Sequence, residues 1–370
     1  MMKVKLGDIC EIKYGFPFDS SKFSDIGGTP LIRIRDIVRG YTETYTSEEF
    51  NDEYIIDNGD MLIGMDGEFN IAKWKGGKAV LNQRVCKIIP NDKVNANYLY
   101  YFMPKALKDI ENQTAFVTVK HLSAKKLNNI EVPLKPLVEQ KQIADTLDEV
   151  SELISLRRQQ IEKLDELVKA RFVELFGDPQ TNPNGYAWVK LSDVATYFNG
   201  LTYKPENVAE VGTIVLRSSN IQSSQLDFAD TVRVDCTVKE KLMVQENDIL
   251  MCSRNGSARL VGKVALIKGI QEPMTFGAFM MIIRSRYHSY LMTYFQMDAF
   301  RQQIKTGATT TINQITGRML DEVTIPLPPM EFVERFAAFV EQTDKSKLTI
   351  QQSLDKLEVL KKSLMQKYFG

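Results

Sequence analysis

Residues 118–133 read TVKHLSAKKLNNIEVP, and residues 311–326 read TINQITGRMLDEVTIP. The two stretches agree at the first threonine, at a leucine near the middle and at the final proline, and most other positions keep their character. A match of this length, 193 residues apart in one chain, predicts an internal repeat. The period is far too long for a solenoid, so it indicates a duplicated domain.

Further matches extend the repeat in both directions. The offset between matched segments grows from 184 at Ile37 and Ile221 to 193 at Leu127 and Leu320, so the loops between them differ in length. A repeated framework with different loops is expected of two scaffolds that hold different specificities. The matched segments are 4–9 with 189–194, Gly15 with Gly200 at a predicted turn, 31–37 with 215–221, 58–63 with 246–251, and 176–177 with 369–370.

The repeat divides the chain into four segments. Residues 1–135 and 179–328 mix short β-type runs with helices, whereas residues 136–178 and 329–370 each read as one long helix. The sequence therefore predicts an α+β fold, in which two pseudo-symmetric mixed α/β domains are joined by two long antiparallel helices forming a coiled coil. The predicted elements of the domains are strands at 31–37, 79–89, 215–221, 263–267 and 280–283, and helices at 97–113 and 290–304.

The two long helices carry apolar residues at a 4-3 spacing, with charged and amide residues elsewhere. Both helices follow prolines, which suit a helix start because no N–H is needed there. The spacing is typical of a coiled-coil seam, and the alternative is two amphipathic helices packed on their own domains. The seam comprises Ile143, Leu147, Val150, Ile154, Ile161, Leu164, Val168 and Leu175, then Phe336, Val340, Ile350, Leu354, Leu357 and Leu364, with interruptions at Arg157, Arg171, Lys347 and Lys361.

Geometry favours the coiled coil. A helix of about 34 residues is a rod of about 50 Å, which exceeds the diameter of one such domain. If the repeat is an approximate two-fold, the second helix runs back along the first and the two chain ends lie close together.

Composition limits the function classes. The chain has 47 basic and 47 acidic residues, and this zero net charge argues against a protein that coats nucleic acid by bulk electrostatics. Its four cysteines are scattered, which favours free thiols in a reducing cytosol, and we expect a cytoplasmic protein. We also find neither a secretory signal nor a membrane-spanning run.

No catalytic constellation is evident. The Asn/Asp-Pro-Pro-Tyr/Phe tetrapeptide of aminomethylases is missing, and the nearest string, residues 182–185, reads as a turn. Residues 11–13 and 139–141 spell Glu-x-Lys without the Pro-Asp of a nuclease, and there is no Walker phosphate loop. The two histidines, His121 and His288, lie in unrelated contexts that favour structural or surface roles. We therefore expect no catalytic residue, no metal and no cofactor.

Residues 132–143 (VPLKPLVEQKQI), at the start of the first long helix, carry a family resemblance. Together with the twice-repeated order of domain and helix, this Pro-Leu-x-x-Gln-x-x-Ile junction resembles the specificity (S) subunit of type I restriction–modification enzymes. The second junction, residues 325–332, keeps the prolines, but Phe332 and the residue after it, Val333, stand where the first junction has Glu139 and Gln140. The resemblance covers essentially the whole chain.

The resemblance implies a non-catalytic subunit of a larger complex. Each domain would be a target recognition domain that reads one half of a bipartite, asymmetric site in double-stranded DNA. The helices would set the half-site spacing and bind two modification subunits that methylate adenine with S-adenosylmethionine, and restriction (motor-nuclease) subunits could join. The alternatives are the specificity component of a related system with a fused modification and cleavage partner, and a protein-binding coiled-coil scaffold.

DNA readout needs side chains with donors in fixed geometry: Arg or Lys for guanine and Asn or Gln for adenine, with further donors for phosphates. Arg33 and Arg217 occupy matching positions, which favours framework or phosphate roles over base reading, and Trp74 belongs either to the core or to a groove contact. The candidates are Lys13, Tyr14, Arg33, Arg35, Asp66, Lys73, Trp74, Asn82, Gln83, Arg84 and Lys120, then Lys204, Arg217, Asn220, Ser253, Arg254, Asn255, Arg259, Thr311, Asn313 and Gln314.

Overall fold

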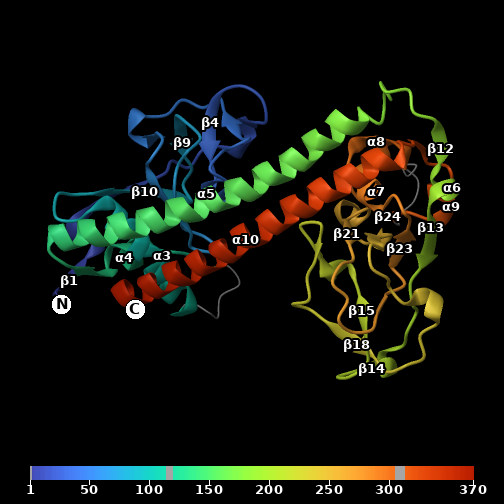
Figure 1. The fold of residues 1–370 in the computed structure, drawn as a ribbon. Coiled ribbons are helices and arrows are strands. Elements are labelled where there is room, and N and C mark those ends of the chain that lie inside the picture. Colours follow the sequence, from blue (N-terminus) through green and yellow to red (C-terminus); the bar gives the residue numbers. More distant parts are fainter. Residues whose placement is uncertain (1, 114–119, 305–312) are drawn as a thin grey trace. The chain divides into compact units, whose positions relative to one another are not determined.

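The computed structural model describes residues 2–113, 120–304 and 313–370, which form two compact units (Figure 1). Unit 1 comprises Met1–Arg158 and Gln352–Gly370, and unit 2 comprises Gln159–Gln351. Each predicted long helix is therefore shared between the units. Both units mix strands and helices, in agreement with the predicted mixed α/β character.

Unit 1 is built on two larger sheets, and β1 pairs with β11 in a two-stranded sheet. One is antiparallel with strand order β2-β10-β7-β8, and the other has the order β3-β5-β4-β9-β6 with a parallel β4–β9 pair. Its elements are β1 Met2–Lys5, α1 Leu6–Ile9, β2 Cys10–Tyr14, η1 Ser20–Lys22, β3 Phe23–Ser24, β4 Thr29–Ile32, α2 Ile34–Arg39, β5 Tyr45–Thr46, η2 Asp52–Tyr54, β6 Ile55–Ile56, β7 Met61–Gly64, β8 Ile71–Lys73, β9 Ala79–Leu81, β10 Val85–Pro90, α3 Ala96–Gln113, α4 Ala124–Asn128, β11 Glu131–Leu134 and the first part of α5 Leu137–Phe176.

Unit 2 repeats this plan. Its antiparallel sheet has the order β13-β23-β19-β21, and the sheet β14-β18-β15-β22 contains the parallel β15–β22 pair. Its elements are β12 Trp188–Lys190, α6 Leu191–Val194, β13 Thr196–Asn199, η3 Pro205–Asn207, β14 Val208–Ala209, β15 Thr213–Leu216, η4 Ser218–Asn220, β16 Ile221–Gln222, β17 Gln225–Leu226, β18 Val232–Val234, η5 Glu240–Leu242, β19 Ile249–Cys252, β20 Arg254–Asn255, η6 Ala258–Leu260, β21 Val264–Leu266, β22 Met274–Phe276, β23 Met280–Arg284, α7 His288–Tyr294, α8 Asp298–Gln303, β24 Asn313–Gln314, α9 Gly317–Asp321, β25 Thr324–Pro326 and the first part of α10 Met330–Phe369.

Two glycines at matching positions allow a close backbone approach in both units. A Cβ on Gly15 would stand 2.1 Å from the Asn82 carbonyl oxygen, and one on Gly200 would stand 2.1 Å from the Gly277 carbonyl oxygen. Any other residue would push the two backbones apart. The repeated glycine marks a tight contact between the two sheets' connecting segments in each unit.

Four predicted elements differ from the structure. The strand predicted at 79–89 is two strands, β9 and β10, separated by residues 82–84. The predicted strands at 31–37 and 215–221 end early, at Ile32 and Leu216, because Asp36 and Asn220 accept hydrogen bonds from backbone N–H groups three residues back and start helical turns. The helix predicted at 290–304 is two helices, α7 and α8. The extended backbone of Met297 separates them and starts the second.

Within each unit, parts of α5 and α10 pack against each other in opposite directions. In unit 2, Phe172 of α5 contacts Phe336 of α10 at 5.6 Å between ring centroids, and Asp165, two turns earlier on α5, pairs with Lys347, about three turns later on α10. In unit 1, Arg158 pairs with Glu358 at 2.7 Å, and Phe369 joins the core cluster that contains Leu147. All fourteen predicted seam residues are buried or partly buried within their units.

The charged residues that interrupt the seam have partners. Arg171 pairs with Glu174 and lies over the Phe339 ring, and Lys347 pairs with Asp165. Lys361 lies over the Tyr101 ring at 5.6 Å, and burial, followed by repulsion from Arg158, lowers its pKa. These contacts explain how a seam tolerates cations without leaving them unpaired.

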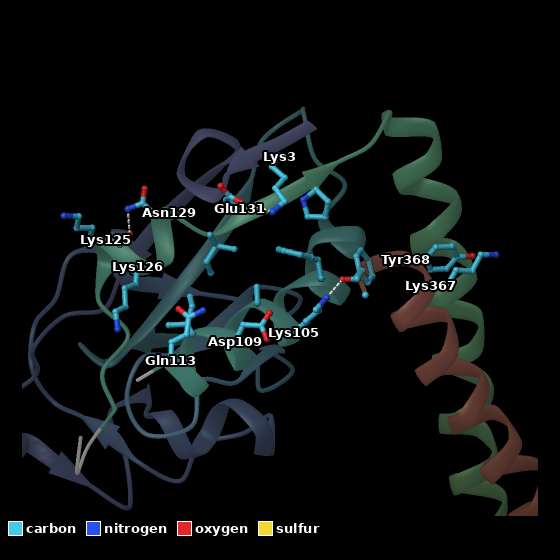
Figure 2. A pocket seen from close by; sticks show the side chains of 17 residues that line it. Lys3, Lys105, Asp109, Gln113, Lys125, Lys126, Asn129, Glu131, Lys367 and Tyr368 are labelled. Atoms are coloured by element: carbon cyan, nitrogen blue, oxygen red, sulfur yellow. Dashed lines mark hydrogen bonds and ion pairs between the residues drawn. The ribbon is translucent and has the colours of Figure 1, made fainter. Parts of the chain in front are cut away.

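The two ends of the described chain lie together in unit 1. Lys3 of β1 and Gly370 after α10 line one cavity of about 890 Å³, and Lys105 donates a hydrogen bond to the Phe369 carbonyl oxygen at 2.5 Å (Figure 2). In unit 2 the corresponding helix end, that of α5, is covered by residues 178–187. There Tyr186 Oη and Asn184 Nδ2 lie 3.3 and 3.4 Å from the Leu175 carbonyl oxygen.

This correspondence predicts that the chain can be circularly permuted. A permutant that starts at Trp188 and joins Gly370 to Lys3 through a copy of residues 178–187 should fold, with a Tm within about 5 °C of the parent. Hydrogen bonds of about 1 kcal/mol each are lost at Leu175 and regained at the matching end of α10, and 1 kcal/mol corresponds to about 2–4 °C. Circular dichroism during heating measures this. A permutant without cooperative unfolding contradicts the paired helix ends.

Three of the four cysteines are buried, and all four are free thiols, as the scattered pattern predicts. Burial raises the pKa of Cys10 and of Cys86 to about 12, so these thiols are chemically inert at neutral pH. Among the described residues, no helix combines the length and apolarity that a membrane crossing requires.

Candidate nucleic-acid interface

One set of predicted residues belongs to a framework that both units share. The Arg33 N–H donates to the Asp36 carboxylate at 2.9 Å, and the Arg217 N–H donates to the Asn220 side-chain oxygen at 2.8 Å. Asp36 and Asn220 are each 1% exposed. The Asn220 amide also donates to the carbonyl oxygens of Asp227 and Asp230. These bonds give Asn220 a structural role.

The arginines of this framework keep their side chains at the surface to different extents. Arg33 is exposed, and Arg35 donates to the Thr44 hydroxyl at 3.2 Å with half of its side chain exposed. Arg217 pairs with Asp230 at 2.7 Å. Arg33 and Arg217 therefore stand at matching positions in the two copies, the first exposed and the second partly buried.

Trp74 is a core residue. It is 1% exposed, and its indole N–H donates to the Gly77 carbonyl oxygen at 2.6 Å, which closes the turn at residues 75–77. The neighbouring Lys73 donates to the Asn97 side chain at 2.7 Å and lies over the Tyr100 ring. Of the two alternatives for Trp74, the structure therefore selects core packing.

Lys13, Tyr14 and Lys120 are tied into local interactions. Lys13 lies 3.8 Å from Glu11, and Lys120 pairs with Glu111 at 3.1 Å. The Tyr14 hydroxyl accepts a hydrogen bond from Asn128, and burial, followed by the effect of Cys86, raises the pKa of Tyr14. Tyr14 is therefore a neutral phenol at physiological pH.

The segment Asn82-Gln83-Arg84 links β9 to β10. The Gln83 N–H donates to the Phe16 carbonyl oxygen, which fixes the loop, while the Gln83 and Arg84 side chains are exposed. Asn82 is partly buried and forms a parallel bridge with Phe16. The loop therefore presents two polar side chains from an immobilised backbone.

Asp66, Arg84 and His121 meet at the end of β7, and we call them the first cluster. Arg84 Nε lies 3.1 Å from one Asp66 carboxylate oxygen, and His121 Nδ1 lies 2.6 Å from the other. Asp66 and His121 also form an antiparallel bridge. One carboxylate thus holds an arginine and an imidazole side by side at the surface.

Arg254, Phe279 and Gln314 lie at the corresponding end of β19, and we call them the second cluster. Arg254 of β20 pairs with Gln314 of β24. Its guanidinium carbon stands 5.5 Å from the centroid of the Phe279 ring, which is 58% exposed. An exposed phenylalanine at a loop tip is costly in water, and it suits a surface that is covered on binding.

The other unit 2 candidates surround this cluster or lie apart from it. Ser253 is buried and its hydroxyl donates to the Phe279 carbonyl oxygen, whereas Asn255 and Asn313 hydrogen-bond to Ser218 and Gly256. Arg259 is exposed, and Lys204 is exposed beside Glu206. Thr311 lies outside the described residues.

Two members of the clusters, His121 and Phe279, were not among the sequence candidates. The repeat itself contains the signal, because His121 aligns with the candidate Gln314 in the opening stretches. Phe279 stands at the position that corresponds to the candidate Arg84. Its side chain has no hydrogen-bond donor, so the criterion used for DNA-reading residues excludes it. Within the described ranges no group of three or more His, Cys, Asp or Glu residues is arranged to hold a metal ion.

Comparisons with known proteins agree with this duplicated architecture. Residues 1–166 and 183–361 each match the family described as type I restriction modification DNA specificity domain. The type I restriction enzyme EcoBI specificity subunit of Escherichia coli is 27% identical, over 100% of this chain and 85% of the relative. The MjaVIII specificity subunit of Methanocaldococcus jannaschii is 24% identical, over 92% of this chain and 88% of the relative.

Solved structures share the fold. The S subunit of a type I restriction–modification system from M. genitalium aligns with a TM-score of 0.59 at 15% identity, over 100% of this chain and 96% of the other. A chain from a structure on complex assembly and conformational transition of the type I R-M system aligns with a TM-score of 0.55 at 19% identity, covering 100% and 97%. The chain therefore belongs to the type I restriction–modification DNA specificity family and is a specificity subunit, the component that recognises DNA.

Proposed function

We propose that residues 1–135 and 179–328 are two target recognition domains, each of which reads one half of a bipartite, asymmetric site in double-stranded DNA. The observation that carries this proposal is that the two units share their buried framework but differ in their exposed side chains. The two units repeat the same buried capping bonds at Asp36 and Asn220, yet their surface clusters differ in every side chain. A duplicated scaffold with different polar tips suits two non-identical targets.

Mapping of methylated adenines tests this function. A host that expresses the chain with the modification subunits of its system should carry methylation at one motif, made of two different half-sites with an unread gap between them. The chain on its own should bind DNA weakly. A continuous or palindromic motif, or methylation without sequence preference, contradicts the proposal.

We propose further that residues 136–178 and 329–370 act as one spacer. Its support is the opposite direction of α5 and α10 within each unit, together with the buried seam residues there. A continuous antiparallel pair would hold the readers at a fixed separation along the duplex. This spacer makes the gap in the DNA site a property of the helices.

The same helices offer apolar side chains to partner proteins. Leu156 and Leu360 are 47% and 45% exposed. Since Arg158 pairs with Glu358 in an antiparallel arrangement, residue 156 stands opposite residue 360. Leu153, on the same flank as Leu156, is also exposed. We assign this surface to one of two modification subunits, which would supply adenine methylation from S-adenosylmethionine, with ATP-dependent motor-nuclease subunits as further partners. The chain itself contributes no catalytic group.

Charging this surface should prevent assembly. We expect Leu156→Glu with Leu360→Glu to weaken binding of the modification subunit about 100-fold, because two apolar contacts are lost and two carboxylates are desolvated. Both residues are half exposed, so the Tm should change by less than about 3 °C. Titration followed by size-exclusion chromatography measures the affinity. Ile26→Glu, at an exposed loop position, is the matched control, and equal affinity of both proteins contradicts the assignment.

A further inference from the structure

The first and second clusters occupy the same three backbone positions. In unit 1 the Met65 N–H donates to the Arg84 carbonyl oxygen at 2.9 Å, and the Leu122 N–H donates to the Met65 carbonyl oxygen at 2.7 Å. In unit 2 the Ser253 N–H donates to the Phe279 carbonyl oxygen at 3.0 Å, and the Ile315 N–H donates to the Ser253 carbonyl oxygen at 2.7 Å. The next residues, at 66 and 254, pair with those at 121 and 314.

The side chains at these positions divide into an inner and an outer set. The inner residues are buried in both units: Met65 and Ser253 at one position, Leu122 and Ile315 at another. The outer residues are the cluster members, and Arg84, His121 and Phe279 are each at least half exposed. The shared backbone hydrogen bonds thus fix the positions of the outer residues in both units, while the residue types at these positions differ.

The first cluster has the chemistry of a guanine reader. Asp66 forms an ion pair with Arg84 through Nε at 3.1 Å and so keeps the guanidinium close to this carboxylate, while the two Nη nitrogens form the fork that matches guanine O6 and N7. His121 Nδ1 contacts the other carboxylate oxygen of Asp66, Oδ1, so Arg84 and His121 each use one oxygen of the same carboxylate. An arginine that is oriented before binding loses less side-chain entropy on contact.

The second cluster has the chemistry of an A·T reader. Gln314 carries the amide that pairs with adenine N6 and N7, and Phe279 offers an exposed ring for the thymine methyl group. Arg254 lies over this ring and keeps a cation beside it for the phosphate backbone. The carboxylate that orients Arg84 in unit 1 is replaced here by Arg254 itself.

We propose that these two clusters determine base identity, with the first cluster requiring a G·C pair and the second an A·T pair in their respective half-sites. The proposal rests on the proposed function and adds the residues and the base class. It assigns a reading role to Phe279 and a positioning role to His121, which acts through Asp66.

Transplanting the second cluster into unit 1 tests the proposal. The variant carries Asp66→Arg, Arg84→Phe and His121→Gln, and it is expressed with the modification subunits while methylated adenines are mapped. We expect one half-site to change from G·C to A·T at one or two positions, with each change worth about 10- to 100-fold in methylation rate. The other half-site and the gap should stay unchanged.

Single variants keep the test decisive if the triple variant folds poorly. Arg84→Gln should relax the requirement for guanine at one position by about 10- to 100-fold, whereas Lys3→Gln, which breaks the exposed pair with Glu131 elsewhere in unit 1, should leave the motif intact. Lower methylation at an unchanged motif in the cluster variants overturns the base-reading role. Failure of the proposed function looks different, because the parent complex would then show no bipartite motif.

Discussion

Replacing Asp248 by alanine should destabilise unit 2 by about 3–5 kcal/mol, because it leaves a partly buried arginine without its counter-ion. Asp248 is 1% exposed, and its two oxygens accept hydrogen bonds from Arg284 Nε at 2.7 Å and Nη2 at 2.8 Å. It also accepts the Gln245 N–H at 2.8 Å. The hydrogen bonds to Asp248 raise the pKa of Arg284. Arg284 stays charged even without them, because a guanidinium is not deprotonated in proteins.

Unit 1 provides the matched control. Asp60 holds the same position, but its partner Lys87 makes a single contact at 2.7 Å, and both side chains are about one-fifth exposed. Asp60→Ala should therefore cost only about 1–2 kcal/mol, since a lysine reaches water more easily. Amide hydrogen exchange measures the stability of each unit separately, through β19 and β23 in unit 2 and through β7 and β10 in unit 1. Equal losses of stability in the two variants would show that the two hydrogen bonds between Arg284 and Asp248 stabilise unit 2 no more than the single contact of Lys87 stabilises unit 1.

This pair illustrates what the sequence alone reveals. Asp60 and Asp248 stand within matched segments, so their framework role follows from the repeat, as do the glycine turns and the proline starts of both long helices. Repetition identifies what both domains need to fold. The repeat is therefore most informative about the framework residues that both domains share. The 4-3 spacing of apolar residues additionally predicts which faces of the two long helices are buried.

The residues of the interface are less evident in the sequence, because the exposure of each side chain depends on contacts between segments that are distant in the chain. Trp74 and Asn220 have the residue types of DNA contacts, yet tertiary packing commits both to structural bonds. His121 becomes a surface partner of Asp66 only when a distant segment pairs with the end of β7. Local pattern also misled at residues 31–37, where a capping aspartate overrides β-branched residues and starts a helical turn.

Lengthening both long helices should lengthen the gap in the DNA site. Three heptads inserted after Arg158 and, on the facing helix, after Leu357 keep the seam in phase and add about 32 Å. That length is close to one full turn of the duplex, about 34–36 Å, so both readers would meet the same face of the DNA again. We expect the same half-sites with a gap of nine or ten more base pairs, and at least about 100-fold less methylation of native sites.

Shorter insertions sharpen the argument. One heptad adds about 10 Å, or about three base pairs, and three base pairs turn the duplex by about 100°, so binding should be weaker than with three heptads. Three heptads in α5 alone leave seam residues without partners and should abolish assembly. Adenine mapping distinguishes these outcomes. Methylation that persists at native sites in the three-heptad variant would mean that the gap is set within the domains, and altered half-site bases would mean that the helices take part in readout.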